Sequence, residues 1–268
     1  MTPSAEPTGH TGHTTGPPGP SVETIDTDVA RVSWAAELHQ GDVWLAVDVV
    51  RRAVEAALGE HTRVEAHVEA DDHTAQRVAT WSGLRREGVR RAVSGDRIVY
   101  ARLANDAPAS EPEGFRALLN SFLPRKRAIS QLLVRDHDGR VLLCELTYKR
   151  DWDLPGGVVE VGESPKVAVG REVEEELGLV LTPDQLLVTD WLPAWSGWDD
   201  AVCLVFDGGS HDASILDAVV REEREIRAAR FCTMAEVHAR CADFTARRVV
   251  AAVASLEGGT ATYVESGR

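Results

Sequence analysis

The pattern of apolar and polar positions predicts two sets of strands and helices, one in each half of the chain. In the first half, helical periodicity over Val43–Leu58 ends at Gly59, and strict alternation over Arg63–Glu69 indicates a strand. The same criteria complete this half with a strand over Val29–Leu38, a helix over His73–Ser82 and a strand over Arg97–Ala104. Strands interspersed with helices are typical of an α/β or α+β protein.

The second half begins with a short helix over Phe115–Leu123 and is richer in strands. The sequence Asp-His-Asp-Gly ending at Gly139 is a hairpin signal between two apolar runs, Ile129–Val134 and Val141–Leu146. The remaining elements expected here are strands over Leu186–Thr189, Val202–Phe206 and Ala229–Cys232, and a closing helix over Ala235–Leu256.

Composition marks the boundaries between these regions. Residues 1–20 are mainly Thr, Gly, Pro and His, which predicts a disordered tail in which His10 and His13 are solvated rather than metal-binding. Residues 105–114 contain prolines and acids and are typical of a linker. We therefore expect a tail at 1–20, a smaller module at 21–104, a linker with a short helix at 105–124, and a larger domain at 125–268.

Charge and cysteine usage exclude several classes of protein. The 268 residues carry a formal net charge of −14, which disfavours nucleic acid and anionic membranes as partners because both need a basic surface. The four cysteines are scattered without a C-x-x-C pair, as in proteins of a reducing compartment. No apolar run approaches the roughly 20 residues of a membrane span, and no secretory signal is present. We expect a soluble cytoplasmic protein.

One motif carries most of the chemical information. From Gly157 to Leu179 the chain reads GVVEVGESPKVAVGREVEEELGL, which fits the pattern G-x5-E-x7-R-E-U-x-E-E-x-G-U with U aliphatic. Ser164 followed by proline is a good helix start, and Gly178 is a good helix end. The helix between them carries three carboxylates on one face at i, i+3 and i+4, namely Glu172, Glu175 and Glu176.

Three carboxylates on one turn repel one another, so stability alone would not select them. A hard divalent cation relieves that repulsion, and ligands that are all oxygen suit Mg²⁺ or Mn²⁺. The alternative is an exposed acidic helix with a glycine cap, the commonest explanation for a short run of glutamates. The preceding Gly156–Gly157 pair favours the metal site, because two glycines allow the backbone to approach a ligand closely.

The complete motif resembles the Nudix box, the signature of enzymes that hydrolyse a diphosphate linked to another group. The resemblance covers about half of the chain and implies an α/β/α sandwich at residues 125–268. It implies that the carbonyl of Gly157 binds metal together with the three glutamates, and that Glu163 pairs with Arg171 to orient the helix. The family often takes a further carboxylate from a later loop, for which Glu225 is our first choice and Glu223 the second.

Side chains beside the motif are candidates for substrate contacts. Lys149 and Arg150 immediately precede the glycine loop and could meet phosphate oxygens, although solvated surface positions are equally consistent with their sequence. Trp195 and Trp198 could stack on a nucleobase, a contact worth about 1–3 kcal/mol, or could simply pack at the rim.

Residues 43–91 resemble the C-terminal half of a Gcn5-related acetyltransferase. The resemblance is carried by LAVDVVR from Leu45, RVEA from Arg63, and QRVA with GLRREG from Gln76 to Gly88. That family has a Gly-rich pyrophosphate loop before the first of these segments, whereas this chain has Gln40-Gly-Asp-Val-Trp44. Because Asp42 would repel phosphate and bulky residues follow it, we expect a degenerate, inactive α+β module that serves packing, homodimer formation or substrate gating.

Together these patterns predict a metal-dependent pyrophosphohydrolase acting on a small phosphorylated molecule, a nucleoside diphosphate derivative or a related phosphoanhydride. The catalytic candidates are Glu175, Glu176, Glu225 and Arg171. Two alternatives stay open: a Nudix-like module that senses a nucleotide derivative without turnover, and a bifunctional acetyltransferase and hydrolase.

Overall fold

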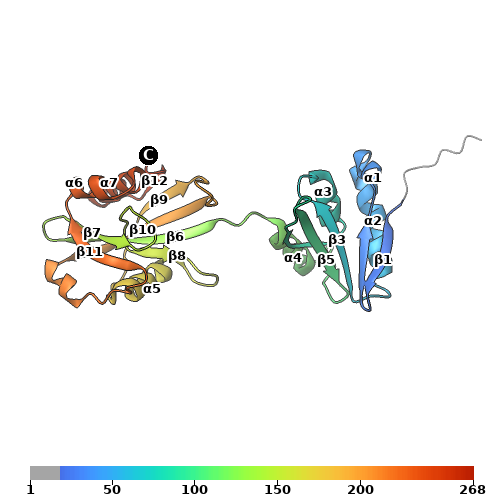
Figure 1. Ribbon diagram of the computed structural model, residues 1–268, viewed down its shortest axis with the longest axis horizontal. Coiled ribbons are helices and arrows are strands. Elements are labelled where there is room, and N and C mark those ends of the chain that lie inside the picture. The colour runs from blue at the N-terminus through green and yellow to red at the C-terminus, as the bar shows by residue number, and fades with distance from the viewer. Residues whose placement is uncertain (1–18) are drawn as a thin grey trace, which may run out of the picture. The chain divides into compact units, whose positions relative to one another are not determined.

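The computed structural model describes residues 19–268, and the chain divides after Pro124 into two compact units (Figure 1). We call residues up to Pro124 the N-terminal unit and Arg125–Arg268 the C-terminal unit. The expected tail, with His10 and His13, falls almost entirely on residues 1–18, outside the described residues. Within 19–268, no helix has the length and apolar character that crossing a bilayer requires.

The N-terminal unit is built on a five-stranded sheet in the order β1-β2-β3-β5-β4. Strands β2 and β3 are parallel and their neighbours are antiparallel. The strands are β1 (Ser21–Asp26), β2 (Val29–Ser33), β3 (Arg63–Glu69), β4 (Arg85–Arg90) and β5 (Arg97–Leu103). The predicted strands at 63–69 and 97–104 are confirmed, whereas β1 and β4 were not foreseen.

Between residues 19 and 124 this unit contains four helices: α1 (Ala36–Gln40), α2 (Val43–Ala57), α3 (His73–Trp81) and α4 (Pro112–Phe122). The predictions for α2 and α3 are confirmed to within a residue at the C-terminus. The strand predicted over Val29–Leu38 is too long, because the Ala- and Leu-containing segment after Trp34 folds into α1. Helix α2 buries Val47, Val50 and Val54 against the sheet.

The N-terminus of α2 is capped by its own chain. The carboxylate of Asp42 accepts hydrogen bonds from the backbone N–H groups of Trp44 (2.9 Å) and Leu45 (3.3 Å). These are N–H groups that a phosphate would use at a helix N-terminus. At the other end of the unit, α4 packs on β4, where the Ser121 hydroxyl accepts the N–H of Arg86 at 3.1 Å. The short helix therefore belongs structurally to the N-terminal unit.

The C-terminal unit contains a mixed seven-stranded sheet in the order β11-β7-β6-β10-β9-β12, with β8 paired to β6. Its strands are β6 (Arg127–Asp136), β7 (Val141–Leu146), β8 (Gly156–Val158), β9 (Leu186–Leu192), β10 (Ala201–His211), β11 (Ile226–Cys232) and β12 (Thr262–Glu265). The five strands predicted for this half are confirmed, most of them longer than expected. Strands β6 and β10 run parallel over most of their length.

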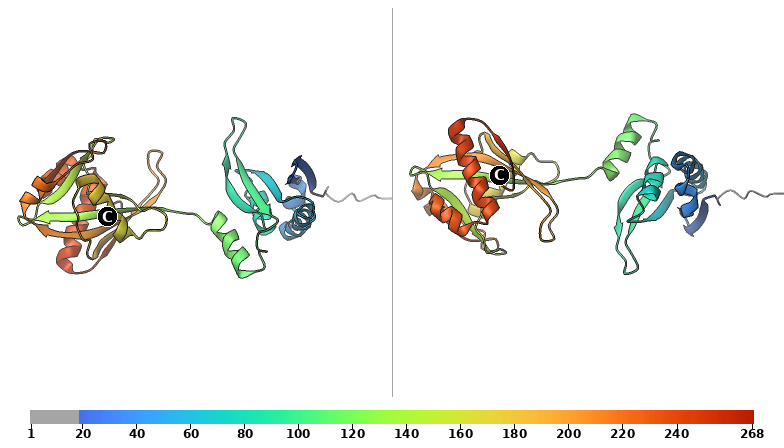
Figure 2. Two further views of the ribbon diagram at one scale, coloured as in Figure 1. Left: turned by 90° about the horizontal axis from the view of Figure 1, so that it is seen from below. Right: turned by 90° about the horizontal axis from the view of Figure 1, so that it is seen from above.

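Helices cover both faces of this sheet (Figures 1 and 2). They are α5 (Pro165–Leu177), a 3-10 turn over Ala213–Ala218, α6 (Met234–Arg240) and α7 (Asp243–Gly258). On one face Val169, Val173 and Leu177 of α5 pack on the sheet, and on the other face α7 contributes Val249 and Ala252. The unit is thus a three-layer α/β/α sandwich, as the motif resemblance implies.

The closing helix predicted over Ala235–Leu256 is in fact two helices. The chain is extended at Cys241, with φ −88° and ψ 156°, and Cys241 forms a β-bridge with Trp152. A capping box between Thr233 and Glu236 starts α6. The break is therefore made by a tertiary contact that the helical periodicity does not reveal.

Candidate active site

Helix α5 begins and ends where the sequence predicts. The Ser164 hydroxyl accepts the N–H of Val167 at 3.3 Å, Pro165 occupies the first turn, and Gly178 ends the helix in the left-handed conformation with φ 67°. The apolar side of the helix is buried on the sheet, which turns Glu172 and Glu176 toward the glycine loop.

The glycine loop is pressed between β6 and α5. A Cβ atom at Gly156, whose φ is 133°, would lie 2.2 Å from the carbonyl oxygen of Ser130. A Cβ at Gly157 would lie 2.4 Å from the carboxyl carbon of Glu172. The N–H of Gly156 donates to the Glu176 carboxylate at 3.0 Å. Gly156 therefore needs glycine because backbone atoms surround it, and a side chain at Gly157 would displace the Glu172 carboxylate.

Glu176 is the most strongly perturbed carboxylate of the site. It is only 5% exposed, and burial raises its pKa to about 8, with further increases from the charges of Glu172 and Glu225. The hydrogen bond from Gly156 opposes this shift. Burial also raises the pKa of Glu172. The site thus concentrates more negative charge than its surroundings neutralise, which is the condition that a bound cation relieves.

Arg171 supplies the nearest positive charge. Its guanidinium makes two hydrogen bonds to Glu163 (2.7 and 3.2 Å) and contacts Glu172 at 3.0 Å and Glu175 at 2.9 Å. The Glu163 hydrogen bonds are the main reason that the pKa of Arg171 is raised. The Glu163–Arg171 pair has the geometry that the resemblance implies, and it ties the loop before α5 to the helix.

The carboxylates do not all converge. Glu175 is turned toward Arg171, and its side chain is 61% exposed. Within residues 19–268, no three His, Cys, Asp or Glu side chains already meet closely enough to hold a metal ion. Glu172 and Glu176 nevertheless lie beside Gly157, and all the donor atoms available there are oxygens. This donor set fits a hard divalent cation.

Glu225 lies at the start of β11, next to β7. Its carbonyl accepts the N–H of Thr147 at 2.8 Å, and its charge raises the pKa values of Glu172 and Glu176. Glu223 is exposed two residues earlier. Tyr148 belongs to the same environment, because burial and then the charge of Glu176 raise its pKa to about 12.

Lys149 and Arg150 differ in their surroundings. The Lys149 ammonium is held by Asp153 at 2.6 Å, whereas Arg150 is exposed. Lys149 therefore lies beside the carboxylate cluster but is already paired with a carboxylate.

Trp195 and Trp198 flank the tip of the β9–β10 hairpin. They exchange backbone hydrogen bonds of 3.0 and 2.8 Å across Ser196 and Gly197, both of which have positive φ as in a type I′ turn. Their rings are 66% and 61% exposed. The Trp195 ring contacts Phe244, and the guanidinium of Arg127 lies over Trp198 at 4.8 Å. These ring contacts are with residues of α7 and β6, and neither involves a box carboxylate.

A buried polar network behind the glycine loop was missed by sequence reasoning. Arg248 of α7 is 2% exposed; it donates to Asp190 of β9 at 2.7 Å and to the side-chain amide oxygen of Gln131 at 3.0 Å. The Gln131 amide donates to Asp153 at 2.9 Å, and Asp153 in turn holds Lys149. An arginine within the apolar stripe of α7 was the one local signal that could have indicated this network.

Comparison with known proteins gives one family. Residues 124–253 match the family model for the NUDIX domain. Over 59 residues the chain is 41% identical to a MutT-like protein of Streptomyces ambofaciens, covering 22% of this chain and 38% of that one. Over 81 residues it is 41% identical to the nucleoside triphosphatase NudI of Escherichia coli O1:K1 / APEC, and this match covers 28% of this chain and 52% of that protein. The chain thus spans about half or less of the length of these curated relatives.

Solved structures give similar matches. A MutT protein from Methanosarcina mazei Go1 is 23% identical, with 52% of this chain and 99% of that one covered and a TM-score of 0.42. A UDP-X diphosphatase is 16% identical, with a TM-score of 0.44, and the match covers 84% of this chain and 99% of that one.

Proposed function

From the premise that residues 124–253 form a Nudix domain, we propose that this chain is a metal-dependent pyrophosphohydrolase. The observation that carries the proposal is the packing of the Gly157 backbone against Glu172, beside the buried carboxylate of Glu176. Backbone and carboxylate oxygens are then available on one side of α5, at the position where the motif resemblance implies that a diphosphate is cleaved.

The proposed cation is Mg²⁺, with Mn²⁺ as an equivalent hard ion. Glu172, Glu175 and Glu176 would hold it together with the carbonyl of Gly157. Bound there, it would neutralise phosphate oxygens and lower the pKa of an attacking water. Its binding requires Glu175 to exchange its contact with Arg171 for the cation, which a surface side chain can do at little cost.

The other candidate residues have distinct proposed roles. Arg171 positions the helix through Glu163 and balances charge on Glu172. Glu225 accepts the proton of the attacking water, since its charge acts on Glu176 and its own side chain is exposed. Lys149 and Arg150 meet phosphate oxygens at the entrance to the loop.

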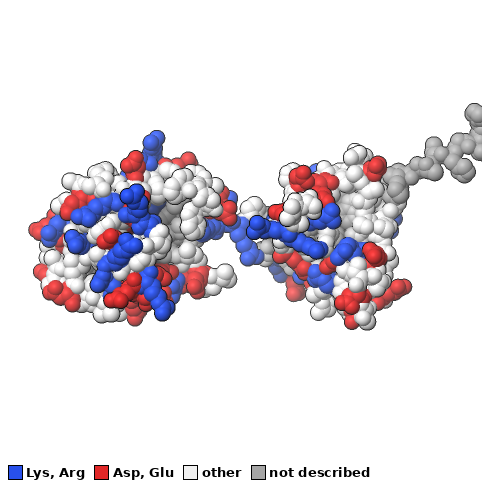
Figure 3. Space-filling model, in the orientation of Figure 1, with Lys and Arg blue, Asp and Glu red and all other residues white. Residues whose placement is uncertain are grey.

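The proposed substrate is a nucleoside di- or triphosphate or a derivative of one. The relative of E. coli that matches this chain is described as a nucleoside triphosphatase. The exposed rings of Trp195 and Trp198 are proposed to stack on the base. Nucleic acid is not a proposed partner, because the net charge is −14 and acidic and basic side chains are interspersed on the face shown in Figure 3.

We further propose that residues 21–104 are an acetyltransferase-like module that has lost its cofactor site. The N–H groups at the start of α2 are occupied by Asp42 instead of being open to a phosphate. A cytoplasmic location completes the proposal and fits four buried cysteines that form no disulfide. Titration of the full chain with acetyl-CoA tests whether the cofactor site is lost. Binding in the micromolar range would contradict that proposal.

The test of hydrolysis is a substrate panel with matched conditions. The full chain is incubated with nucleoside triphosphates, nucleotide sugars, dinucleotides and coenzyme A, with Mg²⁺ or with excess chelator, and released phosphate and monophosphate are quantified. We expect cation-dependent release of a nucleoside monophosphate from at least one class. Undiminished turnover in chelator, or tight binding of every class without turnover, would contradict the proposal, the second result favouring a sensing module.

A further inference from the structure

The buried polar network behind the glycine loop ends at a side chain that reaches solvent. Its inner part joins Asp190 to Arg248 at 2.7 Å and Arg248 to Gln131 at 3.0 Å, and Gln131 then donates to Asp153 at 2.9 Å. All four residues are more than nine-tenths buried. The last contact, 2.6 Å from the Asp153 carboxylate to the Lys149 ammonium, leads out of the core, because the lysine side chain is partly exposed.

Each group of this network is oriented by the group behind it. The Gln131 amide oxygen accepts from Arg248, which turns the amide nitrogen toward Asp153. One oxygen of the Asp153 carboxylate accepts from that nitrogen and from the N–H of Leu154, and the other oxygen accepts from Lys149. The position of the ammonium therefore depends on buried groups and not only on the flexible stem of the lysine.

Asp153 keeps its negative charge although it is buried. Burial by itself would raise the pKa of this carboxyl, but Lys149, Arg248 and Gln131 together lower the pKa below its ordinary value. Buried ion pairs contribute little net stability, because the cost of desolvating both charges offsets their attraction. Stability does not by itself account for a buried network that ends at a lysine.

The outer end of the network adjoins the candidate active site. Gly157 follows four residues after Asp153, and the intervening Gly156 donates its N–H to Glu176 at 3.0 Å. Beyond the effect of burial, the charge of Asp153 helps to raise the pKa of Glu176. Lys149 thus brings a positive charge to the start of the glycine loop, close to the carboxylates of α5.

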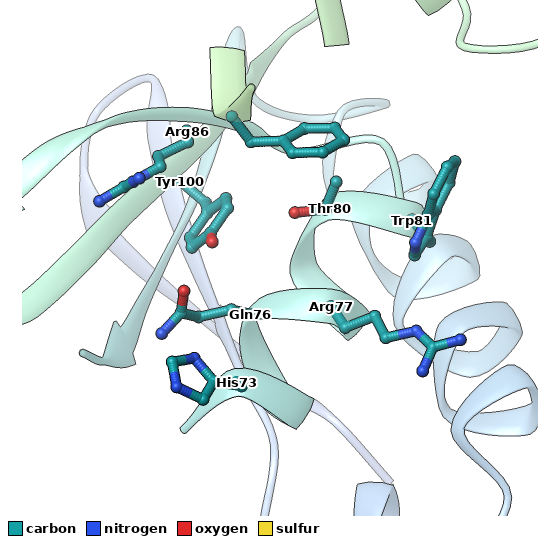
Figure 4. Close-up of a pocket in the computed structure, with 8 residues that line it drawn as sticks. His73, Gln76, Arg77, Thr80, Trp81, Arg86 and Tyr100 are labelled. Carbon is teal, nitrogen blue, oxygen red and sulfur yellow. The ribbon is translucent and has the colours of Figure 1, made fainter. Parts of the chain in front are cut away.

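Polar side chains of the N-terminal unit are arranged differently. At a cavity of about 250 Å³ between α3, the β4–β5 hairpin and α4, the Tyr100 hydroxyl is hydrogen-bonded to Thr80, and the Gln76 amide to a backbone carbonyl (Figure 4). Arg77 extends away from this cavity and lies over the Trp44 ring at 5.5 Å. These contacts join one or two side chains each, whereas the network behind the glycine loop connects the core to an exposed cation.

We propose that Asp153 is a positioning residue, which holds the Lys149 ammonium where it binds a phosphate group of the substrate. The inference rests on the proposed function, which supplies that phosphate. An ammonium that is already in place loses less conformational freedom on binding than a free lysine side chain does. The N–H donors that Asp153 does not use remain for phosphate oxygens.

Kinetics with a substrate from the panel test this role. Asp153→Asn keeps the size of the side chain but loosens the ammonium, so we expect KM to rise by at least about fivefold with kcat changed by less than about twofold. Lys149→Met should raise KM at least as much, and adding Asp153→Asn to it should raise KM no further. An unchanged or lower KM in Asp153→Asn would overturn the proposal, as would an equal effect in both backgrounds. If Asp153→Asn does not fold, Gln131→Met replaces it with the same expectations.

The Arg140–Asp136 pair at the β6–β7 hairpin is the matched control. Its N–O distance is also 2.6 Å, its residues are also four apart, and its cation, like Lys149, is 38% exposed beside a buried carboxylate. Asp136→Asn should leave KM unchanged even if it lowers the melting temperature. A rise in KM equal to that of Asp153→Asn would show a general loss of stability and overturn the positioning role.

Binding of methylenediphosphonate, whose bridging carbon prevents hydrolysis, separates this role from the proposed reaction. Calorimetric titration in Mg²⁺ should give a Kd that rises in Asp153→Asn and in Lys149→Met as KM does. If Kd rises in both variants but no substrate is turned over, the proposed hydrolysis fails and the positioning role stands. Turnover with no change in KM or Kd overturns the positioning role alone, and neither turnover nor binding overturns both.

Discussion

Gly157 and Glu172 adjoin so closely that a Cβ atom at residue 157 would lie 2.4 Å from the carboxyl carbon of Glu172. No side chain larger than hydrogen fits there without displacing the carboxylate or the loop. The requirement for glycine at this position of the motif is therefore steric, since Gly157, unlike Gly156, is not among the glycines with positive φ.

Gly157→Ala is expected to lower kcat/KM by at least about tenfold because the new Cβ displaces the Glu172 carboxylate, while the cost in stability should be small because only the end of that side chain must move. The matched control is Gly170→Ala on α5, where the nearest atoms to a new Cβ are 3.8 Å away. That change should leave activity intact and leave the melting temperature unchanged or raised. Kinetics and thermal unfolding of both variants measure the difference, and similar kinetics for the two would contradict the steric explanation.

Glu176→Gln is expected to reduce kcat by at least about a hundredfold with little loss of stability. The change removes a proposed cation ligand, and it also removes a buried carboxylate whose pKa is raised by burial and by its neighbours. Glu174→Gln alters the same helix at an exposed position that the motif leaves unspecified, and it serves as the control. Equal turnover by the two variants at saturating Mg²⁺ would show that Glu176 is not needed for the reaction.

The stability of the cation-free protein should depend on pH through Glu176. Its folded pKa of about 8 exceeds the ordinary value of 4.5, so the folded state favours the protonated form. The resulting stabilisation, at most about 5 kcal/mol, is complete below pH 4.5 and is lost as pH rises through 8. A divalent cation at the proposed site would bind the ionised form of Glu176, so its stabilising effect should grow over the same range.

Thermal unfolding from pH 5 to pH 9, in chelator and in excess Mg²⁺, measures this dependence. Glu176→Gln should flatten the curve recorded in chelator. A melting temperature in chelator that is the same at pH 5 and pH 8 would count against the raised pKa.

The buried pair Arg248–Asp190 should behave as a unit. Replacing Asp190 alone with Asn leaves a buried guanidinium without its charge partner, which typically costs about 3–5 kcal/mol. Asp190→Leu combined with Arg248→Met removes both charges and should cost less than the sum of the single changes. Urea unfolding of the two single variants and the double variant gives the coupling energy, and simple additivity would contradict a coupled pair.

The two units should fold separately. A chain that begins at Arg125 retains β6 and the whole α/β/α sandwich. A chain that begins near Phe115 would instead carry most of α4 without β4, the strand on which α4 packs. We expect the chain from Arg125 to keep most of the hydrolytic activity of the full protein. A folded but inactive fragment would show that the N-terminal unit contributes to the reaction.

Local signals account for the elements that the sequence predicts well. The ends of α5 depend on Ser164, Pro165 and Gly178, all of which act within one turn of the helix. Strand β3 alternates buried and half-buried residues along its own length, so its pattern is visible without its neighbours. Nothing comparable marks β4, whose sequence RREGVR is polar because the strand lies at the edge of the sheet.

Long-range contacts account for what the sequence could not predict. Arg248 and Asp190 are 58 residues apart, and Arg248 reaches Gln131 across 117 residues. The position of Glu225 follows from the pairing of Ile226 with Leu146, which brings residue 225 beside Thr147. The break between α6 and α7 likewise requires Trp152, which lies far earlier in the chain.

The Asp42 cap on α2 has a consequence for how the N-terminal unit can change over evolutionary time. An anion that approaches this helix end competes with a carboxylate tethered to the same site, whose effective concentration is on the order of millimolar or more. Replacing Asp42 removes that competitor but also removes a cap worth about 0.5–2 kcal/mol. Gaining an anion site at this helix end would therefore begin with a loss of stability before any affinity is gained.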